Sequence, residues 1–315
     1  MVEWKISVSY NIHFGDFSIM PGFFYEPIDR KTFFKASGVL TATALMSRRL
    51  DAIQTTDKSN QVRIALLSDT HIPADENDAY RGFHPTENLK AVVEQVAESA
   101  PAVALINGDA ARSVGSEADY LMLKSLLRPL AQKIPIHIGL GNHDDRRNFF
   151  KIFPAIEKSA VEGKHVSVFE AAGIRFVVLD SLLYVNKVAG LLGKATRSWL
   201  RTYLDQASRK PTLFFVHHTL GDEDSNLLDF DRFFEIVRPH RHVKAIFYGH
   251  SHRYHIKQKE HIYLINQPAL GYNFNDHEPV GWLDATFSPQ GVDLTLRAIA
   301  GDKKGNDKTK AIAWA

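Results

Sequence analysis

The chain of 315 residues contains no cysteine, which excludes disulfide bonds and thiolate metal sites. It has no run of 18 apolar residues, no internal repeat and no low-complexity tract, so we predict no transmembrane helix and no repeat architecture. Its net charge is only +2, which argues against a nucleic-acid partner. With 44% hydrophobic and 23% charged residues, the chain can build the large core of one main domain.

Five short polar motifs each follow an apolar stretch. The stretches cover residues 62–67, 102–106, 134–140, 213–216 and 243–248, and most of them read as buried strands. Function in open α/β sheets gathers outside the carboxyl ends of the strands, so we expect the motifs to meet at one edge. They are Asp69-Thr70-His71, Gly108-Asp109, Gly141-Asn142-His143-Asp144, His217-His218 and Gly249-His250-Ser251-His252.

The spacing within two of these motifs favours metal binding. Alternate side chains of an extended segment point the same way, so Asp69 projects with His71, and His250 projects with His252. Carboxylate oxygens combined with imidazole nitrogens suit Mn, Fe, Co or Zn, whereas Mg and Ca prefer oxygen ligands alone. The motifs therefore predict a site for divalent or mixed-valence transition-metal ions.

In order, spacing and residue type, the motifs resemble the calcineurin-like metallophosphoesterase family over about residues 62–297. The resemblance implies two metal ions that share Asp109 as a bridging ligand. It also implies that His143 is catalytic, either as general acid or as a cation that stabilises the transition state, with Asp144 as the group that orients it. The first ion would be held by Asp69, His71, Asp109 and His252, and the second by Asp109, Asn142, His217 and His250.

Two assignments have alternatives. His218 competes with His217 as the ligand; we favour His217 because it is the first histidine after the strand, and His218 would then pack beside the site or face the substrate. Arg146, or the neighbouring Arg147, could bind a non-bridging phosphate oxygen in a bidentate manner. The other interpretation of these arginines is the solvated first turn of a helix.

The charge balance of such a site predicts its chemistry. Two divalent ions, two carboxylates and a bridging hydroxide leave about one positive charge, which attracts a phosphate ester and activates water for in-line attack. Taken with the family resemblance, this predicts a phosphoesterase acting on a small-molecule phosphate ester, with a phosphodiesterase favoured. The resemblance implies a metal-bridging hydroxide as nucleophile, with His143 assisting the leaving group. The alternatives are a phosphomonoesterase of the same fold and a catalytically silent metal-binding protein.

The elements between the motifs indicate an α/β fold. Helices expected at 86–99 and 118–130 alternate with the first three strands, and further strands are expected at 165–169 and 174–179. Two more helices are expected at 195–207 and 230–237. The last three strands, at 263–266, 282–287 and 292–296, are predicted to be antiparallel. The family resemblance implies a four-layer α-β-β-α sandwich of two mixed sheets, with the metal site at the carboxyl ends of the strands.

Two loops are candidate rims of the substrate pocket. The segment from Leu179-Asp180-Ser181 through Gly190 and Gly193 to Trp199-Leu200 resembles the cyclic-nucleotide-phosphodiesterase-like branch of the family, and its apolar loop 182–192 is one candidate. The other candidate is the loop at 80–84, which follows the first motif. Each loop could equally pack against the rest of the domain without lining the pocket.

The two ends of the chain are predicted to lie outside the phosphoesterase domain, which we place at 61–300. Within an N-terminal extension at 1–60, residues 29–46 resemble a twin-arginine export signal, with Lys31 in place of the second arginine. That resemblance implies a periplasmic or exported protein; the alternative is a cytoplasmic protein whose lead-in packs on the domain. The polar segment 301–315 is predicted to be a flexible tail.

Overall fold

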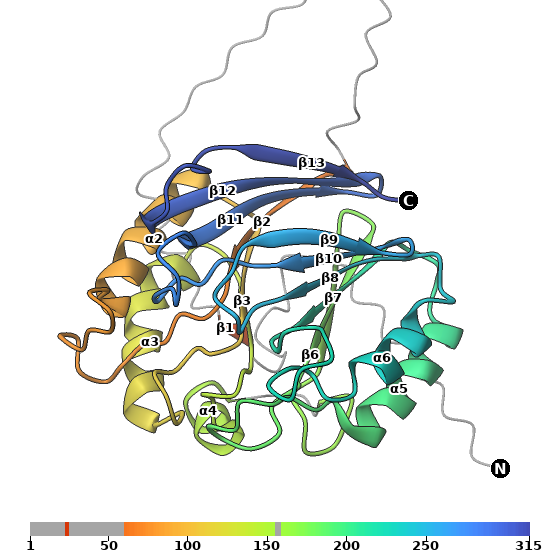
Figure 1. Ribbon diagram of the computed structural model, residues 1–315, viewed down its shortest axis with the longest axis horizontal. Helices are drawn as coiled ribbons and strands as arrows, with labels where there is room; N and C mark the ends of the chain where they lie inside the picture. Colours follow the sequence, from red (N-terminus) through yellow and green to blue (C-terminus); the bar gives the residue numbers. More distant parts are fainter. Residues whose placement is uncertain (1–22, 25–59, 155–158) are drawn as a thin grey trace, which may run out of the picture.

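The computed structural model describes residues 23–24, 60–154 and 159–315, and it contains two β-sheets between layers of helices (Figure 1). The first sheet has the strand order β1-β4-β3-β2-β11-β12-β13 among the described residues. Strands β2, β3 and β4 are parallel, and the other pairings in this sheet are antiparallel. The strands are β1 (Phe23–Phe24), β4 (Ile136–Gly139), β3 (Val103–Asn107), β2 (Val62–Leu67), β11 (Pro279–Ser288), β12 (Gly291–Gly301) and β13 (Thr309–Ala313).

The second sheet has the order β5-β6-β7-β8-β10-β9. Its four inner strands are parallel, and both edge strands pair antiparallel to their neighbours. The strands are β5 (Ser167–Ala171), β6 (Ile174–Leu179), β7 (Thr212–Val216), β8 (Val243–Tyr248), β10 (Ile262–Asn266) and β9 (His255–Lys259).

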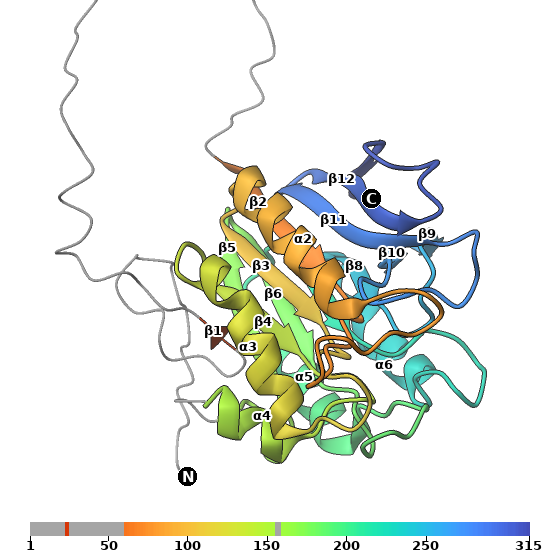
Figure 2. The same ribbon diagram turned by 90° about the vertical axis from the view of Figure 1, so that its left-hand side faces the viewer.

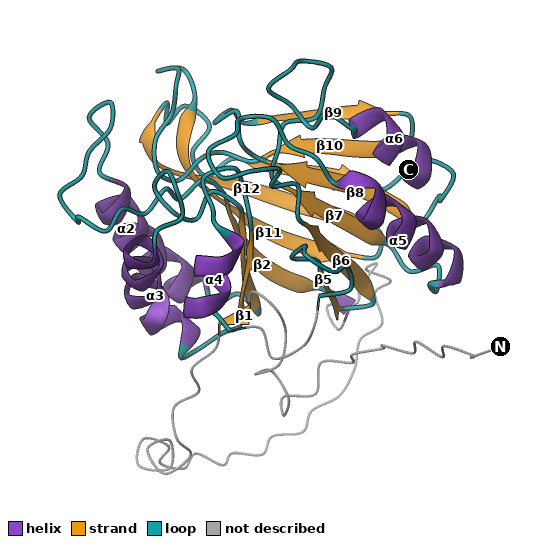
Figure 3. Ribbon diagram, turned by 90° about the horizontal axis from the view of Figure 1, so that it is seen from below, coloured by secondary structure: helices purple, strands orange, loops and turns teal. Residues whose placement is uncertain are grey.

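Helices cover the outer face of each sheet, which confirms the predicted four layers (Figure 3). Helices α2 (Pro85–Ser99), α3 (Glu117–Ala131) and α4 (Arg146–Ile152) lie on the first sheet, and Figure 2 shows α2 and α3 running across it. Helices α5 (Gly193–Gln206) and α6 (Phe230–Val237) lie on the second. No helix within the described ranges is long and apolar enough to cross a bilayer.

The layering explains why the strands read as continuous apolar runs. In β2, Ile64 and Leu66 belong to the core between the two sheets, whereas Ala65 and Leu67 belong to the core under the helices. Because side chains alternate along a strand, a strand between two layers must be apolar on both faces. The core between the sheets is rich in phenylalanine; the Phe215 and Phe247 rings, for example, stack with their centroids 4.8 Å apart.

The structure corrects the predicted end of the domain. The segment 301–315 is not a flexible tail, because β13 pairs with β12 and the side chain of Ile312 is buried in the core between the sheets. The N-terminal boundary was also wrong in part: β1 lies within the predicted extension, yet it pairs with β4, and Phe24 is buried beside Phe153. The segment that resembles an export signal lies outside the described residues.

The predicted pairing of the last strands was half right. Strands β11 and β12 form an antiparallel hairpin, as expected. Strand β10 instead lies in the second sheet, parallel to β8 and antiparallel to β9. Strand β9 was not predicted, because most of its side chains are exposed and polar and it lacks an apolar run.

Candidate metal centre

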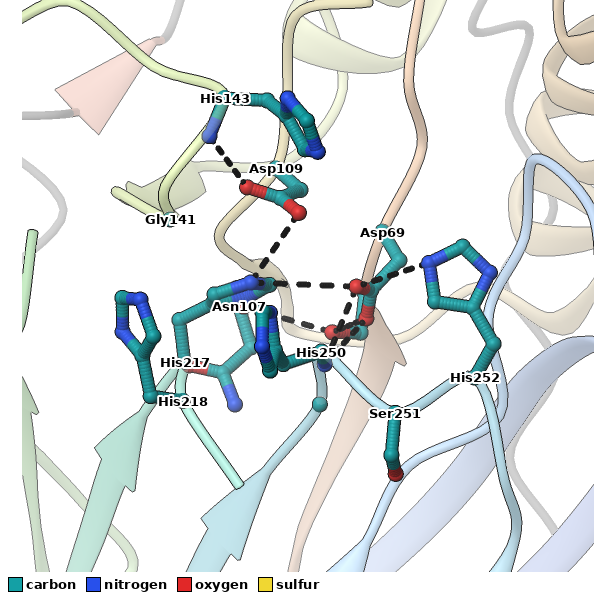
Figure 4. A network of polar contacts seen from close by, with 12 residues as sticks. Asp69, Asn107, Asp109, Gly141, His143, His217, His218, His250, Ser251 and His252 are labelled. Atoms are coloured by element: carbon teal, nitrogen blue, oxygen red, sulfur yellow. Dashed lines mark hydrogen bonds and ion pairs between the residues drawn. The ribbon is translucent and has the colours of Figure 1, made fainter. Parts of the chain in front are cut away.

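All five motifs meet where strands of both sheets end (Figure 4). Backbone hydrogen bonds join the motif loops directly: Asp69 N donates to Gly108 O at 3.1 Å, and His71 N donates to Asp109 O at 2.9 Å. The second sheet is tied in the same way, since Gly249 N donates to His217 O at 2.8 Å. The loops therefore fix one another before any ligand binds.

Six of the seven predicted ligands fall into tight groups of donor atoms. Within each group the atoms lie within 4.8 Å of one another. Asp109 belongs to two groups, which suits a carboxylate shared between two ions, and His143 joins one of them. The groups are Asp69, His71 and His252; His71, Asp109 and His143; and Asp109, His217 and His250.

The backbone at this site is strained. Among the described residues, eleven other than glycine have a positive φ, and five of these are predicted ligands: Asp69, His71, Asp109, His250 and His252. Such residues rarely adopt this conformation, and where they do the surrounding structure must hold them. The strained turns orient these five side chains toward one another.

The rings of three histidines are oriented by backbone carbonyls. Nδ1 of His71 lies 3.2 Å from Arg112 O, Nδ1 of His217 lies 2.9 Å from Asn107 O, and Nδ1 of His252 lies 2.6 Å from Tyr272 O. A carbonyl can only accept, so each Nδ1 carries the proton and each Nε2 has a free lone pair when the ring is neutral. This is the usual support of a metal-binding histidine.

Several buried side-chain polar atoms of the described residues have no hydrogen-bond partner, and two of them belong to predicted ligands: Oδ1 of Asn142 and Nε2 of His217. Of these two, Nε2 of His217 still lies within ion-pair distance of Oδ2 of Asp109, at 3.1 Å. A buried polar atom without a partner is costly, so each such atom needs an explanation, such as a missing ion. The residues present therefore fit a pair of divalent ions.

The charges of the site favour cations. Burial opposes ionisation of Asp69, but His217 and His252 outweigh it and lower the pKa of Asp69 to about 2. Burial also disfavours a charged His217, yet Asp109 and Asp69 prevail and raise its pKa to about 10. Burial lowers the pKa of His71 to about 3. In the protein without ions, a proton on His217 thus partly balances two buried carboxylates.

Gly141 and Gly108 are required by close approach of other groups. A Cβ added at Gly141 would lie 2.7 Å from Cδ2 of His217, and one at Gly108 would lie 2.6 Å from Nδ1 of the same ring. Gly108 also has a φ of +86°. Glycine at both positions lets His217 pack against the loops of the first sheet.

The predicted role of Asp144 was wrong. Its buried carboxylate does not touch the ring of His143 but accepts hydrogen bonds from backbone N–H groups of Ala110, Ala111 and Gly141 and from the hydroxyl of Tyr120. Asp144 therefore joins the second and third motif loops. The ring of His143 is oriented instead by Ser113, whose carbonyl lies 2.8 Å from its Nδ1.

Arg146 and His218, which were predicted as candidate substrate contacts, instead bind other groups of the protein. Nε and Nη2 of Arg146 donate to the carboxylate of Asp180, at 2.5 and 2.8 Å, and Nη2 also donates to Leu182 O, so its guanidinium is already engaged. His218 is fully buried, with Nδ1 2.7 Å from Oγ of Ser181. It packs beside the site, which leaves His217 as the histidine grouped with Asp109.

A cavity of about 840 Å³ opens beside His250 and His252. Both candidate rim loops contribute to it, through Arg81 and Val188. Phe274 also lines it, together with His255, and neither residue was found from the sequence. One feature of the sequence could have pointed to Phe274. It comes after the end of strand β10, just as the polar motifs come after the ends of the other parallel strands.

Comparisons with known proteins agree with this geometry. The family model for the calcineurin-like phosphoesterase matches residues 62–254. A probable cyclic nucleotide phosphodiesterase of Rhodopseudomonas palustris is 32% identical over 243 residues, which cover 69% of this chain and 85% of the relative. The 3′,5′-cyclic adenosine monophosphate phosphodiesterase CpdA of Pseudomonas aeruginosa is 28% identical over 249 residues, 76% of this chain and 82% of the relative.

The fold also resembles that of a solved phosphatase. A dimetal phosphatase from Danio rerio superposes with a TM-score of 0.64 at 14% identity, covering 81% of this chain and 99% of that one. The fold of this family implies a binuclear centre of divalent metal ions, for which this chain has candidate ligands. The chain belongs to the calcineurin-like phosphoesterase family and is a metal-dependent phosphoric ester hydrolase.

Proposed function

We propose that this protein is a phosphodiesterase for small-molecule phosphodiesters, with 3′,5′-cyclic nucleotides as the first candidates. The observation that carries the proposal is the arrangement of the donor groups: two sets of side chains from both sheets converge, with Asp109 and the unpartnered oxygen of Asn142 among them. The names of the relatives supply the candidate substrate.

The groups of donor atoms, together with the unpartnered oxygen of Asn142, support two ligand sets. Asp69, His71 and His252 would hold one ion, and Asn142, His217 and His250 the other, with Asp109 between them. Oδ1 of Asp109 accepts the backbone N–H of His143 at 2.9 Å, whereas Oδ2 lies 3.1 Å from Nε2 of His217 and 3.7 Å from Nε2 of His71. Oδ2 thus faces both histidine sets. We expect Mn, Fe, Zn or Co, because the ligands combine oxygen and imidazole nitrogen.

When bound, two such ions supply an activated water and neutralise charge on the phosphoryl oxygens. The protein supplies the proton for the leaving group. Because Nδ1 of His143 is engaged with Ser113 O, Nε2 is the nitrogen available, and as an imidazolium it can donate a proton to the departing oxygen. A ring nitrogen of His143 lies within 4.8 Å of a carboxylate oxygen of Asp109, which would place the ring beside a phosphate bound at the ions.

The charge of the cavity favours a diester over a monoester. Its lining has as many acidic side chains as Arg and Lys side chains: Asp222, Glu223 and Asp276 against Arg81, Arg253 and Lys257. A diester carries one negative charge and a monoester up to two, so a cavity without an excess of cations suits the diester better.

The test is hydrolysis by metal-free protein resupplied with Mn, Zn, Fe or Co. The substrates are bis(p-nitrophenyl) phosphate, p-nitrophenyl phosphate and 3′,5′-cyclic AMP, and Asp69→Asn is the inactive control. We expect metal-dependent cleavage of both diesters with higher kcat/KM than that of the monoester. Preferential cleavage of the monoester would support a phosphomonoesterase instead. No cleavage by protein with two ions bound would contradict the proposal.

We also propose export, since residues 29–46 resemble a twin-arginine signal. The test is a fusion of residues 1–60 to a reporter in bacteria with and without the twin-arginine translocase. Export that depends on the translocase and is lost in Arg30→Ala supports the proposal; a reporter that stays in the cytoplasm of both strains contradicts it.

A further inference from the structure

Phe274 is an aromatic ring at the edge of the metal centre that the proposed chemistry does not use. It is 53% exposed and lines the large cavity. Its ring centroid lies 4.4 Å from that of His252, with an angle of 30° between the planes. The ring of Phe274 therefore lies against a proposed ligand and meets Tyr272 edge to face, while about half of the residue stays exposed at the cavity.

The two residues before Phe274 are held in place. Before it, Tyr272 O accepts Nδ1–H of His252 at 2.6 Å, which ties the loop to the metal centre. Next to it, Nδ2 of Asn273 donates to Glu278 O at 2.7 Å. The side chain of Glu278 in turn accepts the backbone N–H of Tyr254 at 2.9 Å. The ring is therefore preorganised, and a ligand that stacks on it loses little entropy to ordering.

The surroundings favour a flat ligand with a polar rim. The lining of the cavity that Phe274 borders includes polar side chains, among them Asn226, Asn275 and Tyr248, whose hydroxyl is 2.9 Å from Nε2 of His255. An alkyl chain would form no hydrogen bond with these groups, whereas a nucleobase offers hydrogen-bonding edges around an aromatic face. At about 840 Å³ the cavity is large enough for a nucleoside.

We propose that Phe274 is a specificity-determining residue that stacks on the base of a nucleotide whose phosphate lies at the metal centre. The inference rests on the proposed function and names its substrate class: phosphodiesters with a nucleoside on one side of the phosphorus. The metal ligands would select the phosphate, and Phe274 would select the base.

The test compares two ligands that differ only in the base. Dissociation constants of AMP and ribose 5-phosphate are measured by equilibrium dialysis with the Mn-loaded full chain, while phosphate release is checked in the same samples. We expect AMP to bind about tenfold more tightly, since stacking of a base on an aromatic ring contributes that much affinity or more. In Phe274→Ala and Phe274→Leu the two constants should become nearly equal.

Matched variants separate stacking from a structural effect. Phe274→Trp keeps an aromatic face and should keep the preference for AMP. Leu121→Ala removes another exposed apolar side chain, on helix α3, and should also keep it. An unchanged ratio in Phe274→Ala would overturn the inference, and a preserved ratio in Phe274→Leu would show apolar contact without stacking and would overturn it too.

Dialysis measures binding and does not depend on turnover. The proposed base site and the proposed function can therefore be refuted independently of each other. If the protein binds AMP through Phe274 but cleaves no diester, the proposed function fails and the base site stands. If it cleaves diesters but binds AMP and ribose 5-phosphate equally, the base site fails and the function stands.

Discussion

The backbone N–H of His143 donates to Oδ1 of Asp109 at 2.9 Å, so the proposed catalytic residue helps to aim a proposed bridging carboxylate. The hydrogen bond places Oδ2 toward the histidines of both sets. It also brings the third motif loop against the second, with Asn142 next to His143 in the chain. The position of the proposed proton donor is thus coupled to the position of the proposed ions.

Replacing Asn142 with Ala should remove one ion and most of the activity, because its unpartnered buried Oδ1 is the proposed amide ligand of the second ion. Metal content measured by mass spectrometry should fall from two ions per chain to about one. The control is Asn77→Ala, which changes an exposed asparagine away from the site. Two tightly bound ions in Asn142→Ala would contradict its assignment as a ligand.

Replacing His143 with Ala should leave both ions in place and lower kcat by about 10²- to 10⁴-fold, the usual range for loss of a proton donor. If His143 protonates the leaving group, the loss should be larger for cyclic AMP than for bis(p-nitrophenyl) phosphate, since nitrophenolate leaves without protonation. An equal loss for both substrates would favour charge stabilisation instead. The control is His240→Ala, whose ring pairs with Asp205 outside the site; a wild-type rate in His143→Ala would refute both roles.

Metal binding should release about one proton at pH 7.5, because the ion must displace the proton that the raised pKa of about 10 keeps on His217. The apparent affinity should then rise by about tenfold per pH unit below pH 10. Calorimetric titration with Mn²⁺ in two buffers of different ionisation enthalpy measures the proton count, with His240→Gln as control. Binding without proton release would show that His217 is neutral before the ion arrives.

The same pKa predicts how stability changes with pH in metal-free protein. A histidine whose pKa is raised from 6.5 to about 10 on folding stabilises the fold fully below about pH 6.5, and this contribution is lost as pH rises through about 10. Urea unfolding of metal-free protein between pH 6 and pH 10 measures it. In the metal-loaded protein this loss should disappear, since His217 is neutral throughout.

Replacing Arg146 with Ala should lower stability rather than substrate affinity. The change removes the bidentate cationic partner of the buried Asp180 carboxylate. The backbone N–H groups of His165 and Leu182 remain as donors, and Lys164 Nζ remains at 4.0 Å, so we expect a loss of about 3 kcal/mol. Denaturant unfolding and KM for a diester are measured together. Arg146→Ala/Asp180→Asn should recover part of the stability, since the unpaired charge is gone. A large rise in KM with unchanged stability would restore the phosphate-binding role.

The sequence by itself determined the family, the layers of helices and sheets, and the types of side chain at the metal centre. Strands between two layers are apolar on both faces, so runs such as 62–67 are visible without a structure, and the polar motifs that follow them mark the strand ends. The four helices predicted between the strands lie where periodicity placed them, within two residues at each end.

Only the tertiary structure decided how the side chains are oriented and paired. Ser113, Arg112 and Tyr272 orient histidines through backbone carbonyls, which every residue has, so their identities carry no signal in the sequence. Asp144 follows His143 directly in the chain, yet its carboxylate accepts hydrogen bonds from two loops instead of orienting the His143 ring. Arg146 meets Asp180, which is 34 positions away in the chain. Such pairings depend on how loops from both sheets pack, and local sequence patterns do not encode that packing.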